Sequence, residues 1–311
     1  MKVYKNLAEF DKRNSVVTIG TFDGVHIGHR KIISRLLEVA EQRGGETVIL
    51  TFFPHPRMII HPEDVNLKLI TTIDEKAELL EDLGIDHLII TPFTRDFSNL
   101  APEEYIKQIL VEQIGTQQIV IGYDHRFGKN REGGLTDLLR LAPQYNFEVE
   151  EIPEQDIHDV AVSSTKIREA LLKGDVRTAK DFLGYHFHIT GKVIRGDQIG
   201  RKLGFPTANL LIAETYKILP ADGIYAVRVE ADKTLFNGMA YLGSRPTLNG
   251  MSRNIEANIF NFDQDLYGKD IRLHFIEFIR GDARFDTLED LRRQIEKDQD
   301  TASLILQNKD F

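Results

Sequence analysis

The sequence predicts two folded units of different class: a Rossmann-like, doubly wound α/β domain over residues 1–184 and an antiparallel β-barrel with a C-terminal helix over 185–311. Three observations predict this. Short apolar runs alternate with amphipathic segments in the first half, which is typical of a parallel sheet with right-handed crossovers. From about residue 186, strand-like segments follow one another without helices between them, which indicates an antiparallel barrel or sandwich. With 311 residues and 41% hydrophobic content, the chain is long enough for two cores.

Five strand candidates and the helices between them account for the first half. The expected strands cover 16–20, 46–53, 87–93, 117–124 and 147–153. The helices expected between them cover 30–43, 72–84, 101–115 and 135–145, and the third opens with Pro102. Two short helices, 163–174 and 176–184, close this half, and Gly174 and Gly184 suit their C-terminal stops. Because ligands of such sheets bind beyond the carboxyl ends of the strands, the loops there are where a site is expected.

The second half contains five further strand candidates and one helix. The strands are expected at 187–196, 223–232, 234–243, 254–262 and 270–281, with glycine-rich or polar connections. An amphipathic helix over 287–306 follows, and Thr287 is a plausible N-cap. No repeat or low-complexity segment is visible, so the boundary near residue 184 rests on the change of period alone.

The charge and the missing cysteines exclude several classes of function. There are 48 acidic and 39 basic residues, a net charge of −9, which argues against nucleic acid and against an anionic membrane surface as partners. A phosphate-bearing substrate would therefore need a local site. Zero cysteines excludes disulfides, thiolate nucleophiles and cysteine metal sites, and is compatible with a cytoplasmic location. We expect neither a signal peptide nor a transmembrane segment, since no run of apolar residues is long enough.

A phosphate site is predicted by the stretch GTFDGVHIGH, which follows the first strand candidate. Gly20 and Gly24 permit a tight turn, and Gly28 lets backbone approach a ligand closely. His26 and His29 lie three residues apart at a helix start, so both rings can point one way. Helix-terminal N–H groups and two imidazoles suit a phosphate whose charge grows during substitution. The alternative is a pair of surface histidines, but the position after a first strand favours the HxGH pattern of nucleotidyltransferases.

A second element is expected to hold the far end of a triphosphate. The segment VSSTKIREAL offers hydroxyl groups and cations at a helix start: Ser163, Ser164, Thr165, Lys166 and Arg168. The alternative is a helix cap followed by a solvated face.

Two loops lie where the predicted strands end. The loop 121–134 follows the fourth strand, and TFFPHPR ends the second. His55 in the latter is either part of the site or a packed loop histidine.

Eight motifs in this order resemble the family of bacterial bifunctional riboflavin kinase/FAD synthetases over essentially the whole chain. They are GTFDGVHIGH, TFFPHPR, GYDHRFGKNREGG, SSTKIR, GRKLGFPTANL, GIYAV, GSRPTLNG and IEANIFNFDQDLYG. The resemblance implies an FMN adenylyltransferase (FAD synthetase) domain of the nucleotidyltransferase type at 1–184 and a riboflavin kinase domain at 185–311. Riboflavin and ATP would give FMN and ADP, and FMN and ATP would then give FAD and pyrophosphate, with Mg²⁺ assisting both reactions.

The resemblance also implies roles in the first domain. His26 and His29 would contact the phosphates at the adenylylation centre. The residues implied to bind ATP there are Gly20, Thr21, Phe22, Asp23, Gly28, Asp124, Ser163, Ser164, Thr165 and Arg168. FMN carries its own nucleophilic phosphate oxygen, so positioning and charge stabilisation would be enough for this reaction.

In the second domain the resemblance implies a metal site and a base. Thr207 and Asn209 of GFPTANL would ligate the Mg²⁺ bound to ATP, and both are oxygen donors, which that cation prefers. Glu256 matches the family's catalytic base, and strand alternation places it on the opposite face from Ala257. Further ATP or flavin contacts are implied for Gly191, Lys192, Gly204 and Pro206. The segment 191–204 would be a flexible loop over the phosphates; a plain hairpin turn is the alternative.

Two departures and three rival functions stay open at this point. His125 stands where an aromatic residue is expected and Ser244 where Thr is common, which concerns local nucleotide or flavin contacts. A cytidyl- or pantetheine-specific HxGH transferase would have no use for GFPTANL and IEANIF. A class I aminoacyl-tRNA synthetase conflicts with the acidic charge and lacks anticodon-binding bulk, and a silent flavin-binding protein would not need HxGH or Glu256. Whether the chain forms a homo-oligomer, or channels FMN between its sites, is left open by the sequence.

Overall fold

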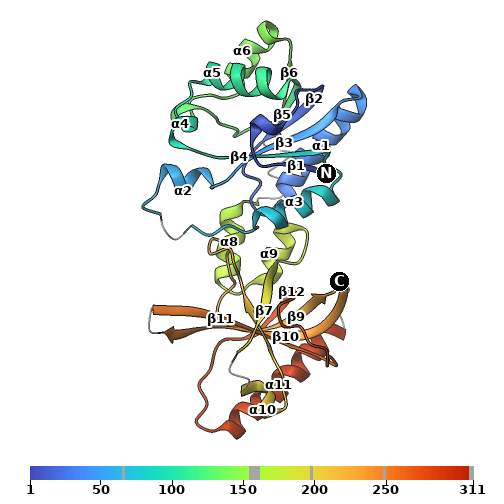
Figure 1. Cartoon of the computed structure of the whole chain (residues 1–311), viewed down its shortest axis with the longest axis vertical. Coiled ribbons are helices and arrows are strands. Elements are labelled where there is room, and N and C mark those ends of the chain that lie inside the picture. Colours follow the sequence, from blue (N-terminus) through green and yellow to red (C-terminus); the bar gives the residue numbers. More distant parts are fainter. Residues whose placement is uncertain (65–66, 154–161, 197–198, 248–249, 308–311) are drawn as a thin grey trace. The chain divides into compact units, whose positions relative to one another are not determined.

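The computed structural model describes residues 1–64, 67–153, 162–196, 199–247 and 250–307. The chain divides into two compact units, Met1–Ser164 and Thr165–Phe311, each with its own fold (Figure 1). Among the helices within the described ranges, none is long and apolar enough to cross a membrane.

The first unit is built on a six-stranded parallel sheet. Its strands are β1 (Lys2–Tyr4), β2 (Ser15–Ile19), β3 (Glu46–Phe52), β4 (His87–Thr91), β5 (Thr116–Gly122) and β6 (Glu148–Ile152). The strand order is β1-β4-β3-β2-β5-β6, so β2 pairs with β3 on one side and with β5 on the other. The chain therefore builds the sheet outward from β2 in one direction and then in the other. This confirms the five predicted strands and the doubly wound class; β1, paired with β4, was not predicted. The change of direction beside β2 is the point where such sheets bind ligands.

Helices cover both faces of this sheet. They are α1 (Ile27–Arg43), α2 (Pro56–Ile60), α3 (Ile73–Asp82), α4 (Arg95–Ser98), α5 (Pro102–Tyr105), which continues as the π-helical η2 (Ile106–Ile114), and α6 (Leu135–Tyr145), with short 3₁₀ turns η1 (Leu7–Glu9) and η3 (Lys129–Arg131). Val17 and Ile19 of β2 pack in one core with η2 and α6, whereas Val16 packs in a second core with α1. The strand that leads into GTFDGVHIGH is thus buried on both faces and holds its carboxyl end firmly in place.

Two helices open the second unit. The helices α8 (Ser164–Leu172) and α9 (Val176–Leu183) confirm the predicted pair, and Gly184 ends α9 with a φ of 78°. The Leu171 carbonyl accepts a hydrogen bond of 3.0 Å from Ala221 N, and Arg177 pairs with Glu277. The two helices therefore lie with the barrel, while the functional boundary at residue 184 stays a prediction.

The barrel is closed and antiparallel. Its strands are β7 (His188–Ile194), β8 (Ala208–Leu211), β9 (Gly223–Ala231), β10 (Thr234–Thr247), β11 (Gly250–Ile259) and β12 (Asp270–Arg280), in the order β10-β11-β8-β7-β12-β9. The expectation of no helix between the strands is wrong at one place, because α10 (Ile199–Leu203) joins β7 to β8. Five residues make little more than one turn, too short to show a helical period in sequence.

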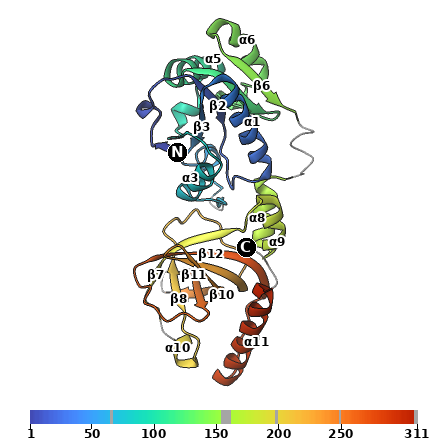
Figure 2. The ribbon, with the colours of Figure 1, turned by 90° about the vertical axis from the view of Figure 1, so that its right-hand side faces the viewer.

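The C-terminal helix α11 (Leu288–Gln307) contacts β9, β10 and β12 on the outside of the barrel (Figure 2). Its first turn is fixed as the sequence predicts, since Thr287 Oγ1 accepts from Asp290 N at 3.1 Å. The segment between β12 and α11 crosses beside β10, so strand, loop and helix enclose a hollow there.

Two candidate active sites

The turn between β2 and α1 has an unusual backbone. Phe22 and Val25 have positive φ angles of 44° and 38°, and Gly24 one of 86°. A β-branched residue such as Val25 rarely adopts this region, and each such non-glycine residue costs on the order of 1–3 kcal/mol. Strain of this kind is kept where a site requires it, which agrees with the prediction that the turn is functional.

The two histidines of the turn lie face to face. His26 is the N-cap of α1, where its Nδ1 accepts a hydrogen bond of 3.3 Å from His29 N. In a neutral His26 the proton therefore sits on Nε2. The two rings stack with centroids 3.6 Å apart, and a Cβ at Gly28 would approach the His26 ring to 3.3 Å. The two rings thus lie together at the start of α1, and their contact with phosphates stays a prediction.

His29 is kept uncharged. Burial lowers its pKa well below the ordinary value, and the nearby His26 and Lys76 act in the same direction. Its Nδ1 has no hydrogen-bond partner among the residues that the structure describes. The arrangement thus presents imidazole groups at a helix N-terminus, where an anion is favoured.

Asp23 is a structural residue of this turn. It is buried, and its Oδ1 accepts hydrogen bonds from Ile70 N at 2.9 Å and Thr71 N at 3.2 Å. Its own carbonyl accepts from Ser164 Oγ at 3.0 Å, so one residue of the predicted second element reaches the turn. The structure thus brings Ser164 and GTFDG together, and the nucleotide contact of Asp23 stays a prediction.

For the remaining predicted residues of the first site, the structure gives a position in a loop or helix. Asp124 is exposed just after β5, which pairs with β2, so it lies at the predicted edge of the sheet. Ser163 is half-buried directly before α8, whereas Thr165 and Arg168 belong to the second unit and their phosphate contacts stay predictions. His55 caps α2 by accepting from Arg57 N at 3.2 Å, which supports its reading as a packed loop histidine.

His125, the departure noted in the sequence, is also kept neutral. Burial, followed by the charge of Arg131, lowers its pKa to about 4. Its ring stacks on Phe127 with centroids 5.8 Å apart. It therefore serves as a flat uncharged ring, in the manner of the aromatic residue expected there.

Sequence reasoning missed a group of aromatic rings at the same edge of the sheet. Successive ring contacts with centroids 5.1–5.8 Å apart join Phe93, Phe52, Phe97, Tyr105 and Phe127. The Tyr105 hydroxyl is buried and unpartnered within the described residues, and burial raises its pKa. The available signal was an aromatic residue at or just past the ends of β3, β4 and β5.

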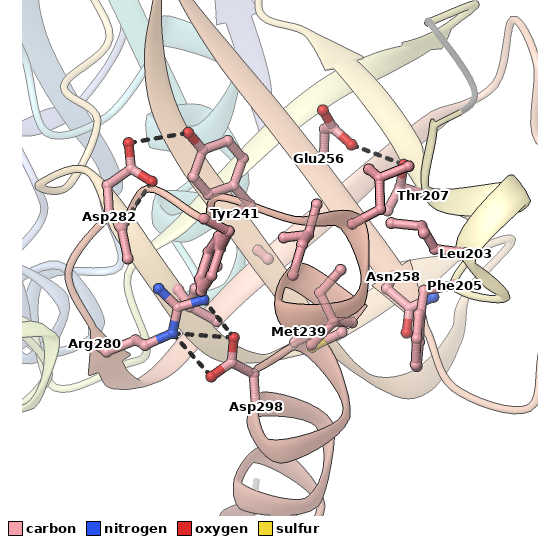
Figure 3. A pocket seen from close by; sticks show the side chains of 18 of the residues that line it. Leu203, Phe205, Thr207, Met239, Tyr241, Glu256, Asn258, Arg280, Asp282 and Asp298 are labelled. Carbon is pink, nitrogen blue, oxygen red and sulfur yellow. Dashed lines mark hydrogen bonds and ion pairs between the residues drawn. The ribbon is translucent and has the colours of Figure 1, made fainter. Parts of the chain in front are cut away.

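The second site is built around a carboxylate on the barrel. Glu256 of β11 lies opposite Asn209 of β8 in the strand register. Thr207 Oγ1 donates a hydrogen bond of 2.8 Å to Glu256 Oε2 (Figure 3). Asn254 Nδ2 donates to Oε1 of the same carboxylate. Each carboxylate oxygen thus has a donor that fixes its direction. The structure brings Thr207, Asn209 and Glu256 together, and the roles that the resemblance implies for them stay predictions.

Thr207 and Glu256 lie in the wall of a cavity of about 490 Å³. Its other walls are largely apolar and come from α10, the barrel and α11: Leu203, Phe205, Ile224, Met239, Phe285, Leu291 and Ile295. An ion pair closes one side, where Arg280 holds the buried Asp298 through both carboxylate oxygens at 2.7–3.1 Å (Figure 3). The volume and the apolar lining suit a flat organic ligand.

A second, more polar cavity of about 410 Å³ shares Thr207 with the first. Its lining includes Arg201, Asp263, Gln264, Asp265 and Tyr267. Pro206 also lines this second cavity. Together with Gly204 it lines a third cavity of about 450 Å³.

Other predicted residues of the barrel do not line these three cavities. Gly191 and Lys192 lie on β7, and a Cβ at Gly191 would come within 2.7 Å of Ile212, so this glycine serves close packing. The side chain of Ser244 and residues 197–198 of the predicted loop lie outside the described residues.

The residues that the resemblance implies as ligands of a metal ion, Thr207 and Asn209, would offer a hydroxyl and an amide oxygen. Within the described ranges no group of three or more His, Asp or Glu side chains could hold an ion. A Cβ at Gly196 would collide with the Asn209 amide, so the glycine makes room for that group. Thr207 gives its only hydroxyl proton to Glu256, which leaves its oxygen lone pairs for a cation. This donor set fits Mg²⁺, which prefers oxygen ligands and completes its shell with phosphate and water.

The chain is similar to two known families in sequence. A family model for FAD synthetase matches residues 8–166, and one for riboflavin kinase matches residues 183–306. The bifunctional riboflavin kinase/FMN adenylyltransferase of Listeria monocytogenes is 36% identical over 304 residues, which cover 97% of this chain and 96% of the relative. The enzyme of the same description from Escherichia coli is 34% identical over 299 residues, 96% and 94% of the two chains.

One solved structure is similar over the full length. It is that of a macrolide-efflux protein from Streptococcus pneumoniae, with a TM-score of 0.86 and 28% identity, and 99% of both chains is covered.

Proposed function

The chain belongs to the family of bifunctional riboflavin kinase/FMN adenylyltransferases, and on that premise we propose which of its residues carry each reaction. The enzyme phosphorylates riboflavin to FMN with ATP. It then joins FMN to the adenylyl group of ATP to give FAD and pyrophosphate. The match of the barrel to riboflavin kinase supports placing the first reaction there, and the match of the parallel-sheet unit to FAD synthetase supports placing the second beside HxGH.

In the kinase reaction, Glu256 acts on the terminal ribityl hydroxyl of riboflavin. The observation that carries this role is the 2.8 Å hydrogen bond from Thr207, made at the wall of the apolar cavity. Thr207 and Asn254 each donate to one carboxylate oxygen, which fixes the direction in which Glu256 would meet a substrate hydroxyl. The ribityl oxygen bonds to the γ-phosphorus, the bond to the ADP oxygen breaks, and the hydroxyl proton passes to Glu256. A loose phosphoryl transition state needs this proton removed only late.

The two cavities that share Thr207 support a division of substrates. The flavin ring is expected in the 490 Å³ cavity, since its walls are largely apolar. The nucleotide is expected in the 410 Å³ cavity, which carries Arg201 and several polar groups. Thr207 and Asn209 would hold Mg²⁺ at the boundary. When bound, this ion would offset charge on the phosphate oxygens of ATP.

In the adenylyltransferase reaction, the chain's groups stabilise charge. An FMN phosphate oxygen attacks the α-phosphorus of ATP, and the bond to pyrophosphate breaks. His26 offers Nε2–H as a donor, because its Nδ1 is engaged by His29 N. The N-terminus of α1 adds its N–H groups, and Ser163, Ser164, Thr165 and Arg168 are expected on the leaving pyrophosphate. The half-buried rings of Phe52, Phe93 and Phe97 supply flat surfaces for the flavin ring.

One incubation tests both assignments. The protein is mixed with riboflavin, ATP and Mg²⁺, and the flavins are separated by chromatography over time. We expect FMN to appear first and FAD to follow, with neither formed when Mg²⁺ is chelated. FAD formation that needs no FMN, whether added or already present in the preparation, would contradict the proposal. Full activity in the presence of a chelator would contradict it too. The cytoplasmic location stays a prediction from the sequence.

A further inference from the structure

The turn that carries HxGH is held in place by a segment that no sequence motif marked. Besides the bonds to Asp23, Gly24 N donates to Thr71 Oγ1 at 3.2 Å. Lys76 of α3 donates from Nζ to the Thr21 carbonyl at 2.7 Å, and the same carbonyl accepts from Thr51 Oγ1 at 3.3 Å. The Thr21 carbonyl is therefore fixed by two donors from two different elements.

Lys76 is an unusual lysine. It is 4% exposed, and within the described part of the chain no carboxylate forms an ion pair with it. It also follows the capping box of Thr72 and Glu75, in the first turns of α3, where the helix dipole disfavours a cation. Burying an ammonium group under these conditions costs free energy, which indicates that the charge is needed at this place.

We propose that Lys76 is a positioning residue of the adenylyltransferase site, which fixes the Thr21 carbonyl and places a positive charge beside His29 where phosphates react. This inference rests on the proposed function of HxGH. The charge of Lys76 acts on His29 directly, as one of the causes that keep this imidazole neutral. Because His29 itself carries no charge, the ammonium supplies the positive potential that a growing phosphate charge needs.

The groups that face Lys76 set its titration. Asp23 faces it from the β2–α1 turn and favours the charged form, His29 faces it from α1, and Thr21 and Thr51 are neutral. Burial dominates and lowers the pKa of Lys76 to about 8. The positive charge is thus present below about pH 8 and is lost above it. FAD synthesis should fall across that range, whereas the kinase reaction in the other unit should not.

Two substitutions separate the charge from the hydrogen bond. Lys76→Met removes both, whereas Lys76→Gln keeps a donor of similar reach for the Thr21 carbonyl. The exposed Lys107→Met on η2 is the matched control. For each purified full-length protein, kcat and KM for FMN are measured between pH 6.5 and 9.5, with riboflavin phosphorylation and thermal unfolding measured on the same preparation.

We expect both Lys76 variants to lower kcat for FAD synthesis by about tenfold or more, with KM for FMN within about threefold. Removing a donor that contacts the reacting phosphate directly lowers kcat by about 10²- to 10³-fold. We expect a smaller effect here because Lys76 acts through the Thr21 carbonyl and through its charge. The fall above pH 8 should disappear in both variants, and kinase activity should stay as in wild type. Lys107→Met should change neither reaction.

Several results would overturn the inference while leaving the proposed function intact. They are a wild-type enzyme that makes FAD with no fall between pH 7 and 9.5, a Lys76→Met rate within threefold of wild type, or full rate in Lys76→Gln. If one variant fails to fold, the other variant and the wild-type pH profile are read together. A wild-type protein that makes FMN but no FAD would instead overturn the proposed function of the HxGH site.

Discussion

Replacing Glu256 by Gln tests the proposed base with little change in shape. In the native site both carboxylate oxygens accept hydrogen bonds, one from Thr207 and one from Asn254. A glutamine has one acceptor oxygen and one NH₂ group, so one of the two donors would face another donor. Thr207 can turn its hydroxyl to accept instead, but its proton then points toward the expected Mg²⁺ position. The substitution therefore removes the proposed base and also disturbs the proposed metal ligand Thr207.

The two effects have different magnitudes and different readouts. Loss of general-base assistance lowers the rate by roughly 10² to 10⁴. A mismatched hydrogen bond between these half-buried side chains lowers the free energy of unfolding by at most about 1–3 kcal/mol. We expect FMN formation from riboflavin to fall by at least 10²-fold, while FMN supplied to the same preparation still becomes FAD. Chromatography of both reactions measures this, with urea unfolding in parallel.

A matched control and a clear refutation are available. Glu289 is an exposed carboxylate on α11, paired with Arg293, and Glu289→Gln should leave both reactions as in wild type. If riboflavin phosphorylation by the Glu256→Gln enzyme stays within about tenfold of wild type, Glu256 is not the base, since this is below the usual worth of one.

Three further outcomes are expected. His29→Ala should lower the rate of FAD formation by about 10²- to 10³-fold and leave FMN formation intact, because it removes a group that is proposed to lie beside the reacting phosphates; equal loss of both activities in the same assay would assign the histidine to folding. Arg280→Leu should lower the free energy of unfolding in urea by about 3 kcal/mol, since it leaves the 3%-exposed Asp298 without its cation; a double variant that also carries Asp298→Leu should recover much of this loss. A fragment of residues 165–311 should phosphorylate riboflavin, whereas 185–311, without the helices that pack on the barrel, should unfold at lower temperature in a melting experiment; equal melting temperatures would favour the boundary at 184.

The parts of the fold that could be predicted are those whose sequence shows a hydrophobic period or a motif. The strand before GTFDGVHIGH and the amphipathic α11 fall in this class. The elements missed are short and depend on distant partners: β1 has three residues and exists because Lys2–Tyr4 pairs with β4. Likewise α10 and β8, with five and four residues, leave no periodic trace. Such elements are held by tertiary contacts that a local pattern does not contain.

The candidate sites show the same limit. His26, His29, Thr207 and Glu256 were identified because motifs contain them. Lys76 was not, since a lysine in an amphipathic helix reads as a solvent-facing residue. Its burial follows from the packing of α3 near the β2–α1 turn, a long-range fact that the helix sequence alone does not determine.

Thr207 lies in the walls of two cavities at once, and this has a consequence for any measurement on the kinase. A ligand that turns or engages its hydroxyl in one cavity alters the surface that a ligand meets in the other. Thermodynamic linkage then requires reciprocity: the factor by which nucleotide changes the affinity for flavin equals the factor by which flavin changes the affinity for nucleotide. A dissociation constant for riboflavin is therefore defined only at a stated nucleotide concentration, and two titrations in opposite order must close the same cycle.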